Sequence, residues 1–255
     1  MTALYWAASD SLTLIGRNVR HTMRSVDALM TAVALPVMIL LLFTYVFGGA
    51  IEAPGRYLDY VVPGIVLLAA GFGSATTAVA VNEDMTTGVV DRFRSLPIAA
   101  PAVLTGHVVA SVLRNVVSTG LVVAVALLIG FDPQAGVLDW LAVAGLLLVF
   151  MTAISWLATC FGMLAGSAEA AGAFSFVVMF LPYLSSAFVP TSTMPDGLRQ
   201  VAEHQPVTPV VDAVRSLTMG APAGADALVA VAWWLGFAVL GCAGATLLFR
   251  RRAAR

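Results

Sequence analysis

The sequence has 255 residues, of which 60% are hydrophobic and only 11% are charged, and its mean hydropathy is +0.94. Because a soluble domain carries about 25% charged residues, this composition excludes an ordinary soluble protein and indicates that most of the chain lies in a membrane. The formal net charge of −1 offers no basic surface to nucleic acid.

The polar residues do not form a recognisable catalytic site. All 13 lysine-or-arginine positions are arginine, and a phosphate-binding P-loop needs a lysine, so any ATP that drives this chain must be hydrolysed by another one. His21, His107 and His204 are far apart, and no HExxH, GxSxG or CxxC spacing occurs. We therefore expect no enzyme activity, no metal site and no cofactor bound by this chain. The residues after Met1 lack a basic run followed by an apolar core, so we also expect no cleaved signal peptide.

The first predicted element is an amphipathic helix over Asp10–Arg24, within an interfacial segment of residues 1–28. At helical spacing one narrow stripe is apolar and the opposite face is basic, which is typical of helices that lie flat on a bilayer. A solvated helical stub is the alternative. The apolar stripe holds Leu12, Ile15, Val19 and Met23, and the basic face holds Arg17, Arg20 and Arg24.

Six apolar blocks follow, each of about the 20 residues that a helix needs to cross a bilayer. They are continuously apolar, without the two-residue alternation of barrel strands, so the predicted fold is an all-α membrane protein with six transmembrane helices. Pro36, Pro63 and Pro182 predict kinks or half-helices. The predicted spans are approximately Leu29–Gly48, Tyr60–Val81, Val103–Gly130, Trp140–Ala165, Ala170–Pro190 and Ala227–Phe249.

The distribution of arginines predicts the orientation. With both termini in the cytoplasm, most arginines lie on the cytoplasmic side, as the positive-inside rule requires. The inside set is Arg17, Arg20, Arg24, Arg92, Arg94, Arg250, Arg251, Arg252 and Arg255, and the outside set is Arg56, Arg199 and Arg215. Aromatic residues near the span ends predict interfacial belts, and they are Tyr45, Phe47, Tyr57, Tyr60, Trp140, Trp233 and Trp234.

Spans two and five carry the candidate substrate path. Span two is rich in small residues from Ala69 to Ala78, which let helices approach closely, and its hydroxyls could also line a path. Span five carries an aromatic and methionine stripe, typical of core packing or of a lipid-facing surface, that also suits a permissive apolar substrate surface. The candidate path residues are Phe72, Ser74, Thr76, Thr77, Phe176, Met179, Phe180 and Tyr183.

The segment between spans two and three, Asn82–Pro101, is the only well-charged internal segment on the predicted cytoplasmic side. It reads NEDMTTGVVDRFRSLPIAAP, with charges that can pair with a partner beside apolar side chains that can dock. We predict a short helix at the membrane surface, on which a separate motor protein acts. A solvated loop with ordinary cytoplasmic arginines is the alternative.

Arg114 lies within the third span. A charge there costs at least about 2.5 kcal/mol, so its side chain should face protein, water or the interface. Two interpretations stay open. Arg114 forms a structural ion pair with Glu83, Asp84 or Glu169, or it contacts the substrate.

The segment Thr191–Asp226 is predicted to lie outside and to contain two short helices. The first covers about Pro195–His204, and the second begins with an N-cap at Thr208 and a proline at its first helical position. Gly220 is a predicted stop. The pair either dips into the outer leaflet between spans five and six or rests on the surface as an amphipathic cap. The apolar face of the second helix holds Val210, Val211, Val214 and Leu217.

Two patches of the sequence carry a family resemblance. In the first, Glu83 and Gly88 precede the run Asp91–Ile98, which reads DRFRSLPI. In the second, the run Phe188–Pro190 is followed by Met194-Pro195 and by His204–Arg215, which reads HQPVTPVVDAVR. The chain resembles the type-2 ABC exporter permeases, and most closely the daunorubicin-resistance-type drug permeases. The resemblance covers nearly the whole chain, and its motifs mark the permease class well and the cargo poorly.

The resemblance implies partners as well as a fold. Such permeases pair as dimers, and each half docks one cytoplasmic ATP-binding subunit, which holds the ATP and Mg²⁺. The segment after span two is then the coupling helix, seated in a cleft of that subunit. The candidate coupling residues are Glu83, Asp84, Gly88, Arg92, Phe93, Arg94, Leu96 and Pro97.

We therefore expect the membrane subunit of an ATP-driven exporter in the bacterial plasma membrane. It would work as a homodimer with two ATPase copies and move an amphipathic drug, natural product or lipid. An exporter of this class for polysaccharide or lipid-linked glycan would need a wide polar groove rimmed by aromatics. An ion-coupled secondary transporter would need titratable groups at mid-membrane, which are sparse here. A membrane anchor that does not transport would show no substrate-stimulated ATP hydrolysis.

Overall fold

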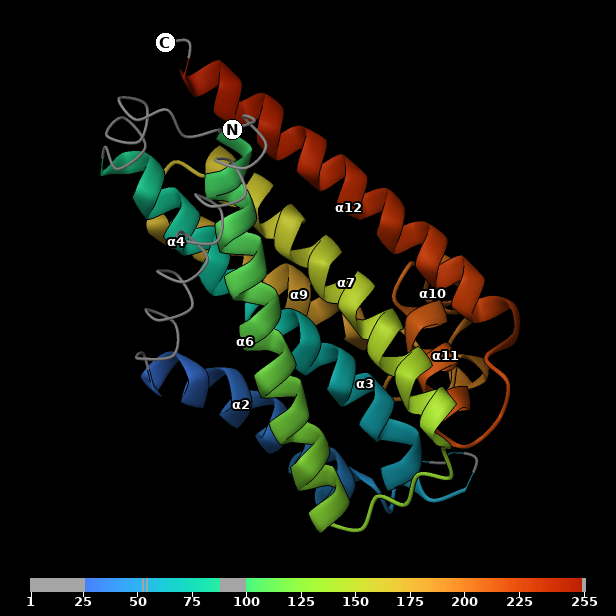
Figure 1. Cartoon of the computed structure of the whole chain (residues 1–255). Coiled ribbons are helices and arrows are strands. Elements are labelled where there is room, and N and C mark those ends of the chain that lie inside the picture. The colour runs from blue at the N-terminus through green and yellow to red at the C-terminus, as the bar shows by residue number, and fades with distance from the viewer. Residues whose placement is uncertain (1–25, 52, 54, 88–99, 254–255) are drawn as a thin grey trace.

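The computed structural model describes residues 26–51, 53, 55–87 and 100–253 (Figure 1). Every regular element in these ranges is helical, which confirms the predicted all-α class. The predicted amphipathic helix over Asp10–Arg24 lies outside the described residues. The elements are α2 (Val26–Leu41), η1 (Leu42–Phe47), α3 (Tyr57–Phe72), α4 (Ser74–Thr86), α6 (Ala100–Leu128), α7 (Val137–Leu164), α8 (Ala168–Gly172), α9 (Phe174–Tyr183), η2 (Thr191–Thr193), α10 (Asp196–His204), α11 (Thr208–Thr218) and α12 (Gly224–Ala253).

Four helical segments are long and apolar enough to cross a membrane, and two more apolar segments are shorter. The long ones are Tyr57–Thr86, Val103–Leu128, Val137–Leu164 and Gly224–Arg251, and the short ones are Val33–Phe47 and Ala168–Tyr183. All six coincide with predicted spans in chain order. The first and fifth are too short to be counted as spans by length alone, so the number six stays a prediction.

The second span is the centre of the bundle. In its apolar window 78% of the residues are buried, against 17% for the window of α12. The outer half of this span, α3, packs mainly on α6 and α2, whereas the inner half, α4, packs mainly on α7 and α8. α12 lies along α7 for most of its length (Figure 1). The break between the halves falls at Gly73, while the three prolines predicted to cause kinks all lie inside helices.

Small residues allow close helix contacts, as the sequence predicted. A Cβ added at Gly64 would lie 2.6 Å from the Cβ of Ala187, and one added at Gly71 would lie 2.9 Å from a methyl of Val178. These contacts bring α3 against α9 and the segment that follows it. The small residues of span two are therefore used for packing.

The outer segment divides into two helices with different environments. Most of α10 is exposed, whereas α11 lies among α3, α7 and α12, and its Val210, Val211 and Val214 are no more than 1% exposed. α11 is therefore inserted into the bundle, and α10 rests outside it. The predicted N-cap at Thr208 is wrong by one position, because Val207 is the N-cap and Thr208 already belongs to the helix.

The two ends of the bundle differ in their contents. The end of α4, the start of α6 and the end of α12 lie together, and α10, α11 and the start of α3 lie at the opposite end (Figure 1). We call these the inner and the outer end, after the predicted orientation. Arg250 and Arg251 belong to the inner end, and Arg56, Arg199 and Arg215 to the outer end. Most of the arginines predicted to lie inside fall outside the described residues, so the orientation stays a prediction.

Three of the aromatic residues assigned to interfacial belts are buried instead. Tyr57 and Tyr60 are 8% and 7% exposed, and Trp234 is 1% exposed. Their polar atoms donate to backbone carbonyls, Tyr57 to Phe188 and Trp234 to Pro206. A buried tyrosine or tryptophan needs such a partner, and the partners come from segments that are distant in sequence.

Candidate coupling and transport site

The described part of the predicted coupling segment is the last turn of α4. Glu83 is exposed there and Asp84 is partly buried. The Oδ2 of Asp84 lies 3.0 Å from the Nε2 of His107, so this contact joins the end of α4 to the first turns of α6. Both helices that flank residues 88–99 are therefore tied together at the inner end. Gly88, Arg92, Phe93, Arg94, Leu96 and Pro97 lie outside the described residues, and their coupling role stays a prediction.

Asn82 fixes the inner half of span two to the end of α7. Its amide is buried and donates to the carbonyl of Gly162 at 3.0 Å and to that of Ala165 at 2.7 Å. The last carbonyls of a helix lack partners within the helix, so Asn82 caps α7. A Cβ added at Gly162 would lie 2.2 Å from the carbonyl oxygen of Ala78, so the backbones of α4 and α7 are in direct contact. α4 and the end of α7 therefore form one packed unit.

Arg114 reaches from α6 to the break in span two. Its Nη2 donates to the carbonyl of Gly73 at 2.8 Å and to the hydroxyl of Thr77 at 2.8 Å. Neither partner is an acid, so the predicted ion pair with Glu83, Asp84 or Glu169 is wrong. A helix break leaves carbonyls without their usual partners, and one of them receives the guanidinium. Sequence reasoning misses this partner because it is a backbone atom.

Asn115, the neighbour of Arg114, is fully buried against the same break. A Cβ added at Gly73 would lie 2.2 Å from the Oδ1 of Asn115, so a larger residue at this position would displace the Asn115 side chain. Among the described residues, neither the Oδ1 nor the Nδ2 of Asn115 has a hydrogen-bond partner, and neither does the Nε of Arg114. A buried polar group without a partner costs about 1–3 kcal/mol. An asparagine in the middle of an apolar span was the available signal for this site.

The candidate path residues of span two lie mostly inside the bundle. Ser74 and Thr77 are buried, and Phe72 is partly buried. The hydroxyls of Ser74 and Thr76 donate to the carbonyls of Gly71 and Gly73. These hydroxyls therefore complete the backbone hydrogen bonding around the break.

The candidate path residues of span five form a different surface. Phe176 and Phe180 are 60% and 54% exposed, Tyr183 is 37% exposed, and Met179 is partly buried. Tyr183 stacks on Phe188 with ring centroids 4.7 Å apart, and Phe188 lies 4.5 Å from Phe43 of η1. α9 and η1 therefore share an outward-facing aromatic surface. The structure does not bring this surface and the buried span-two hydroxyls together within one chain.

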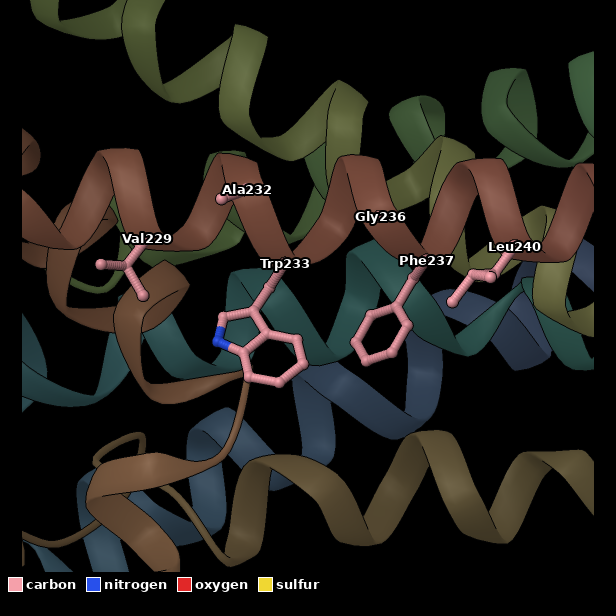
Figure 2. Close-up of a pocket in the computed structure, with 6 residues that line it drawn as sticks. All are labelled: Val229, Ala232, Trp233, Gly236, Phe237 and Leu240. Atoms are coloured by element: carbon pink, nitrogen blue, oxygen red, sulfur yellow. The ribbon is translucent and has the colours of Figure 1, made fainter.

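A hollow of about 380 Å³ lies on an exposed side of α12 (Figure 2). The rings of Trp233 and Phe237 stack with centroids 5.6 Å apart, and both point away from the same side of the helix (Figure 2). An apolar helix face of this kind fits lipid acyl chains. None of the predicted path residues lines it. The lining residues are Val229, Ala232, Trp233, Gly236, Phe237 and Leu240.

Arg215 of α11 organises the outer end. Its guanidinium pairs with Asp212 at 2.6 Å, donates to the carbonyl of Ser186 at 2.7 Å and to that of Tyr60 at 3.2 Å, and lies 3.9 Å above the ring of Tyr60. The hydroxyl of Ser186 donates to Asp212 at 2.6 Å. We call these four residues the Arg215 network. It joins α3, α11 and the segment after α9, whereas the sequence marked Arg215 as an outer arginine at the end of the second resemblance patch and predicted none of these partners.

Comparison with known proteins decides the family. Residues 10–219 match the ABC-2 type transporter family. This chain belongs to the ABC-2 type transporter family. It is 33% identical over 216 residues to the daunorubicin resistance ABC transporter permease protein DrrB1 of Streptomyces coeruleorubidus, covering 84% of this chain and 76% of the relative. It is 24% identical over 224 residues to the probable doxorubicin resistance ABC transporter permease protein DrrC of Mycobacterium tuberculosis, and this match covers 87% of this chain and 81% of the relative.

Membership of this family confirms the predicted resemblance. The chain is a multi-pass membrane permease, and its family implies an ATP-binding subunit as partner. In this ABC-2 permease, the inner end of α4 carries the predicted coupling residues Glu83 and Asp84, and the inner ends of α4 and α6 flank residues 88–99.

Proposed function

We propose that this permease is the membrane subunit of an ATP-driven exporter of amphipathic drugs, natural products or lipids. It works as a homodimer in the bacterial plasma membrane, and each copy docks one separately encoded ATP-binding subunit. The observation that carries the cargo class is the similarity, over 84% of this chain, to a daunorubicin resistance permease. The second relative is named for resistance to doxorubicin.

The chain itself supports a division of labour between subunits. It contains no lysine, so it cannot form the P-loop whose lysine reaches the phosphates. We propose that ATP and Mg²⁺ bind in the partner subunit and that this chain has no enzyme activity of its own. No group of His, Cys, Asp and Glu among the described residues is arranged to hold a metal ion.

The geometry of the inner end supports a route for the force. Residues 88–99 connect α4 to α6, and the Asp84–His107 contact ties these helices at 3.0 Å. Closure of the ATP-binding subunits would push on this connection and therefore on the inner ends of α4 and α6. Asn82 passes the movement of α4 to the end of α7. Spans two and five then redirect a cavity at the interface between the two permease copies.

The test is ATP-dependent uptake of daunorubicin into inverted membrane vesicles that contain this permease and its ATP-binding subunit. The fluorescence of the drug reports its accumulation. Changing Arg92 and Arg94 together to alanine should reduce uptake at least tenfold and should weaken co-purification of the ATPase. Changing Arg250 and Arg251 to alanine is the matched control, because this pair has the same charge and belongs to the inner end but lies outside the coupling segment.

Three results would oppose the proposal. Uptake that survives ATP depletion and is abolished by an uncoupler would indicate a secondary transporter. Unchanged uptake and unchanged ATPase binding in the Arg92/Arg94 variant would remove the coupling assignment. ATP hydrolysis that responds to a lipid-linked glycan and not to daunorubicin would favour the glycan exporter.

A further inference from the structure

The break at Gly73 divides the second span into halves that belong to different parts of the bundle. α3 ends at Phe72 and α4 begins at Ser74. α3 packs mainly on α6 and α2, whereas α4 packs mainly on α7 and α8, and both halves also touch α6, α7 and α9. An unbroken helix would carry any movement of its inner end rigidly to its outer end. This one has a point at which the two halves can change their angle.

The neighbouring helix α6 occupies that point with two polar residues. Arg114 holds the carbonyl of Gly73 and the hydroxyl of Thr77, so a single guanidinium bonds to the break itself and to the first turn of α4. Asn115 packs so closely against Gly73 that a side chain at position 73 would displace its amide. These contacts set the angle between α3 and α4 in the structure.

The hydrogen bonding at this point is incomplete among the described residues. The amide of Asn115, which is fully buried, and the Nε of Arg114 have no partner there. They face a break whose backbone groups are released from regular helical bonding. A second angle between α3 and α4 would expose other backbone groups of the break to the same amide and guanidinium. Two alternative sets of hydrogen bonds are what a two-state element requires.

We propose that Gly73 is a hinge in the second span and that Arg114 and Asn115 are positioning residues that hold it in one of two angles. The inference rests on the proposed function, because the movement that uses the hinge enters α4 from the ATP-binding subunit. α4 has 13 residues and is therefore about 20 Å long. A change of about 20° at Gly73 moves its inner end by about 7 Å.

The experiment measures the distance between a spin label at Thr86, at the exposed inner end of α4, and one at Leu128, at the exposed outer end of α6. Cys160 and Cys242 are first replaced by serine. Labelled permease is diluted into unlabelled permease so that only pairs within one chain contribute. Distances are recorded for the complex with its ATP-binding subunit, with and without a non-hydrolysable ATP analogue. A pair at Leu128 and Val137 is the control, because both residues lie at the outer end.

The expected result is a shift of about 5 Å or more in the Thr86–Leu128 distance on adding the analogue, with the control pair unchanged. Arg114→Met should broaden the distance distribution before any nucleotide is added and should reduce daunorubicin uptake at least fivefold. Arg114→Lys keeps one donor that can reach the Gly73 carbonyl and should restore part of the narrow distribution. A purely structural arginine would give no such difference between the two substitutions at equal thermal stability.

A second variant keeps the hinge testable if single changes at Gly73 prevent folding. Gly73→Ala with Asn115→Ala removes the close contact and supplies a better helix former at the break. This pair should fold, and the nucleotide-dependent shift should fall below about 2 Å. Equal distances with and without nucleotide in a wild-type complex that transports daunorubicin would overturn the hinge alone. A wild-type complex with no ATP-dependent uptake would overturn the proposed function. In that case the distance distributions of Arg114→Met and wild type without nucleotide would still decide whether Arg114 positions α4.

Discussion

Within the described ranges, Arg114 and Arg215 both lie among apolar helices, and their surroundings differ. Arg215 at the outer end has a carboxylate, two carbonyls and an aromatic ring as partners. Arg114 at mid-span has one carbonyl and one hydroxyl, and its Nε and the neighbouring Asn115 amide lack partners among the described residues. The first site is saturated with favourable contacts, and the second is not.

The difference separates a fixed part of the molecule from a part that can rearrange. Each nitrogen of the half-buried Arg215 guanidinium has a partner, so a movement of this side chain would break an ion pair or a hydrogen bond. A site with unused donors and acceptors can lower its free energy by moving to a position where they form hydrogen bonds. The Arg215 network therefore fixes α11 to α3, and the Gly73 junction (Gly73, Arg114 and Asn115) allows α4 to move against α3.

The largest expected effect follows from removing the saturated arginine. Arg215→Met leaves Asp212 without its cation and the carbonyls of Ser186 and Tyr60 without this donor, which should lower the free energy of unfolding by about 3 kcal/mol. For a chain of this size the Tm should fall by about 6–12 °C. Arg114→Met should lower the Tm by less than half as much, because an uncharged carbonyl or hydroxyl that loses its donor costs less free energy than an unpaired carboxylate. Thermal unfolding of the purified permease in detergent measures both.

Arg199→Ala is the control for this comparison. Arg199 pairs with Glu203 at 2.7 Å on the exposed α10, and such surface pairs contribute little, so the Tm should not change measurably. Equal losses for Arg215→Met and Arg114→Met would remove the distinction between a fixed and a movable site.

The next largest effect concerns the packing of α4 on α7 at the inner side of the Gly73 junction. Gly162→Ala would force α4 and α7 apart, since the new Cβ would meet the Ala78 carbonyl at 2.2 Å, and we expect a loss of about 1–3 kcal/mol. Gly145→Ala is a matched control on the same helix, because a Cβ there meets nothing within 4 Å. It should be neutral or slightly stabilising. Equal Tm values for the two variants would show that α4 is not packed tightly on α7.

The sequence was sufficient for features that depend on local pattern. Apolar blocks of span length predicted the order of the helices, and the small residues from Ala69 to Ala78 predicted close packing, which Gly71 shows. The predicted stop after α11 is met by Gly220, whose φ is +71°. These features follow from hydropathy, spacing and backbone freedom within a short stretch.

The sequence was insufficient wherever a partner comes from far along the chain. Arg215 bonds to Tyr60, 155 positions away, and Arg114 bonds to Gly73, 41 positions away. Both acceptors are backbone carbonyls, which every residue has, so no pattern of side chains marks them. Glu83, Asp84 and Glu169 are the acids that the sequence offers to Arg114, but the helix break supplies a backbone carbonyl instead.

The smallest expected effect concerns the connection between α4 and α7. Asn82→Ala leaves the carbonyls of Gly162 and Ala165 without a donor, which should lower the free energy of unfolding by about 1 kcal/mol. Amide hydrogen exchange in the last turn of α7 should accelerate severalfold, because an uncapped helix end opens more easily. Thr86→Ala is the control, since the Thr86 hydroxyl bonds only to carbonyls of its own helix. If exchange in α7 is the same in both variants, α4 and α7 do not move as one body, and a hinge at Gly73 would act on α4 alone.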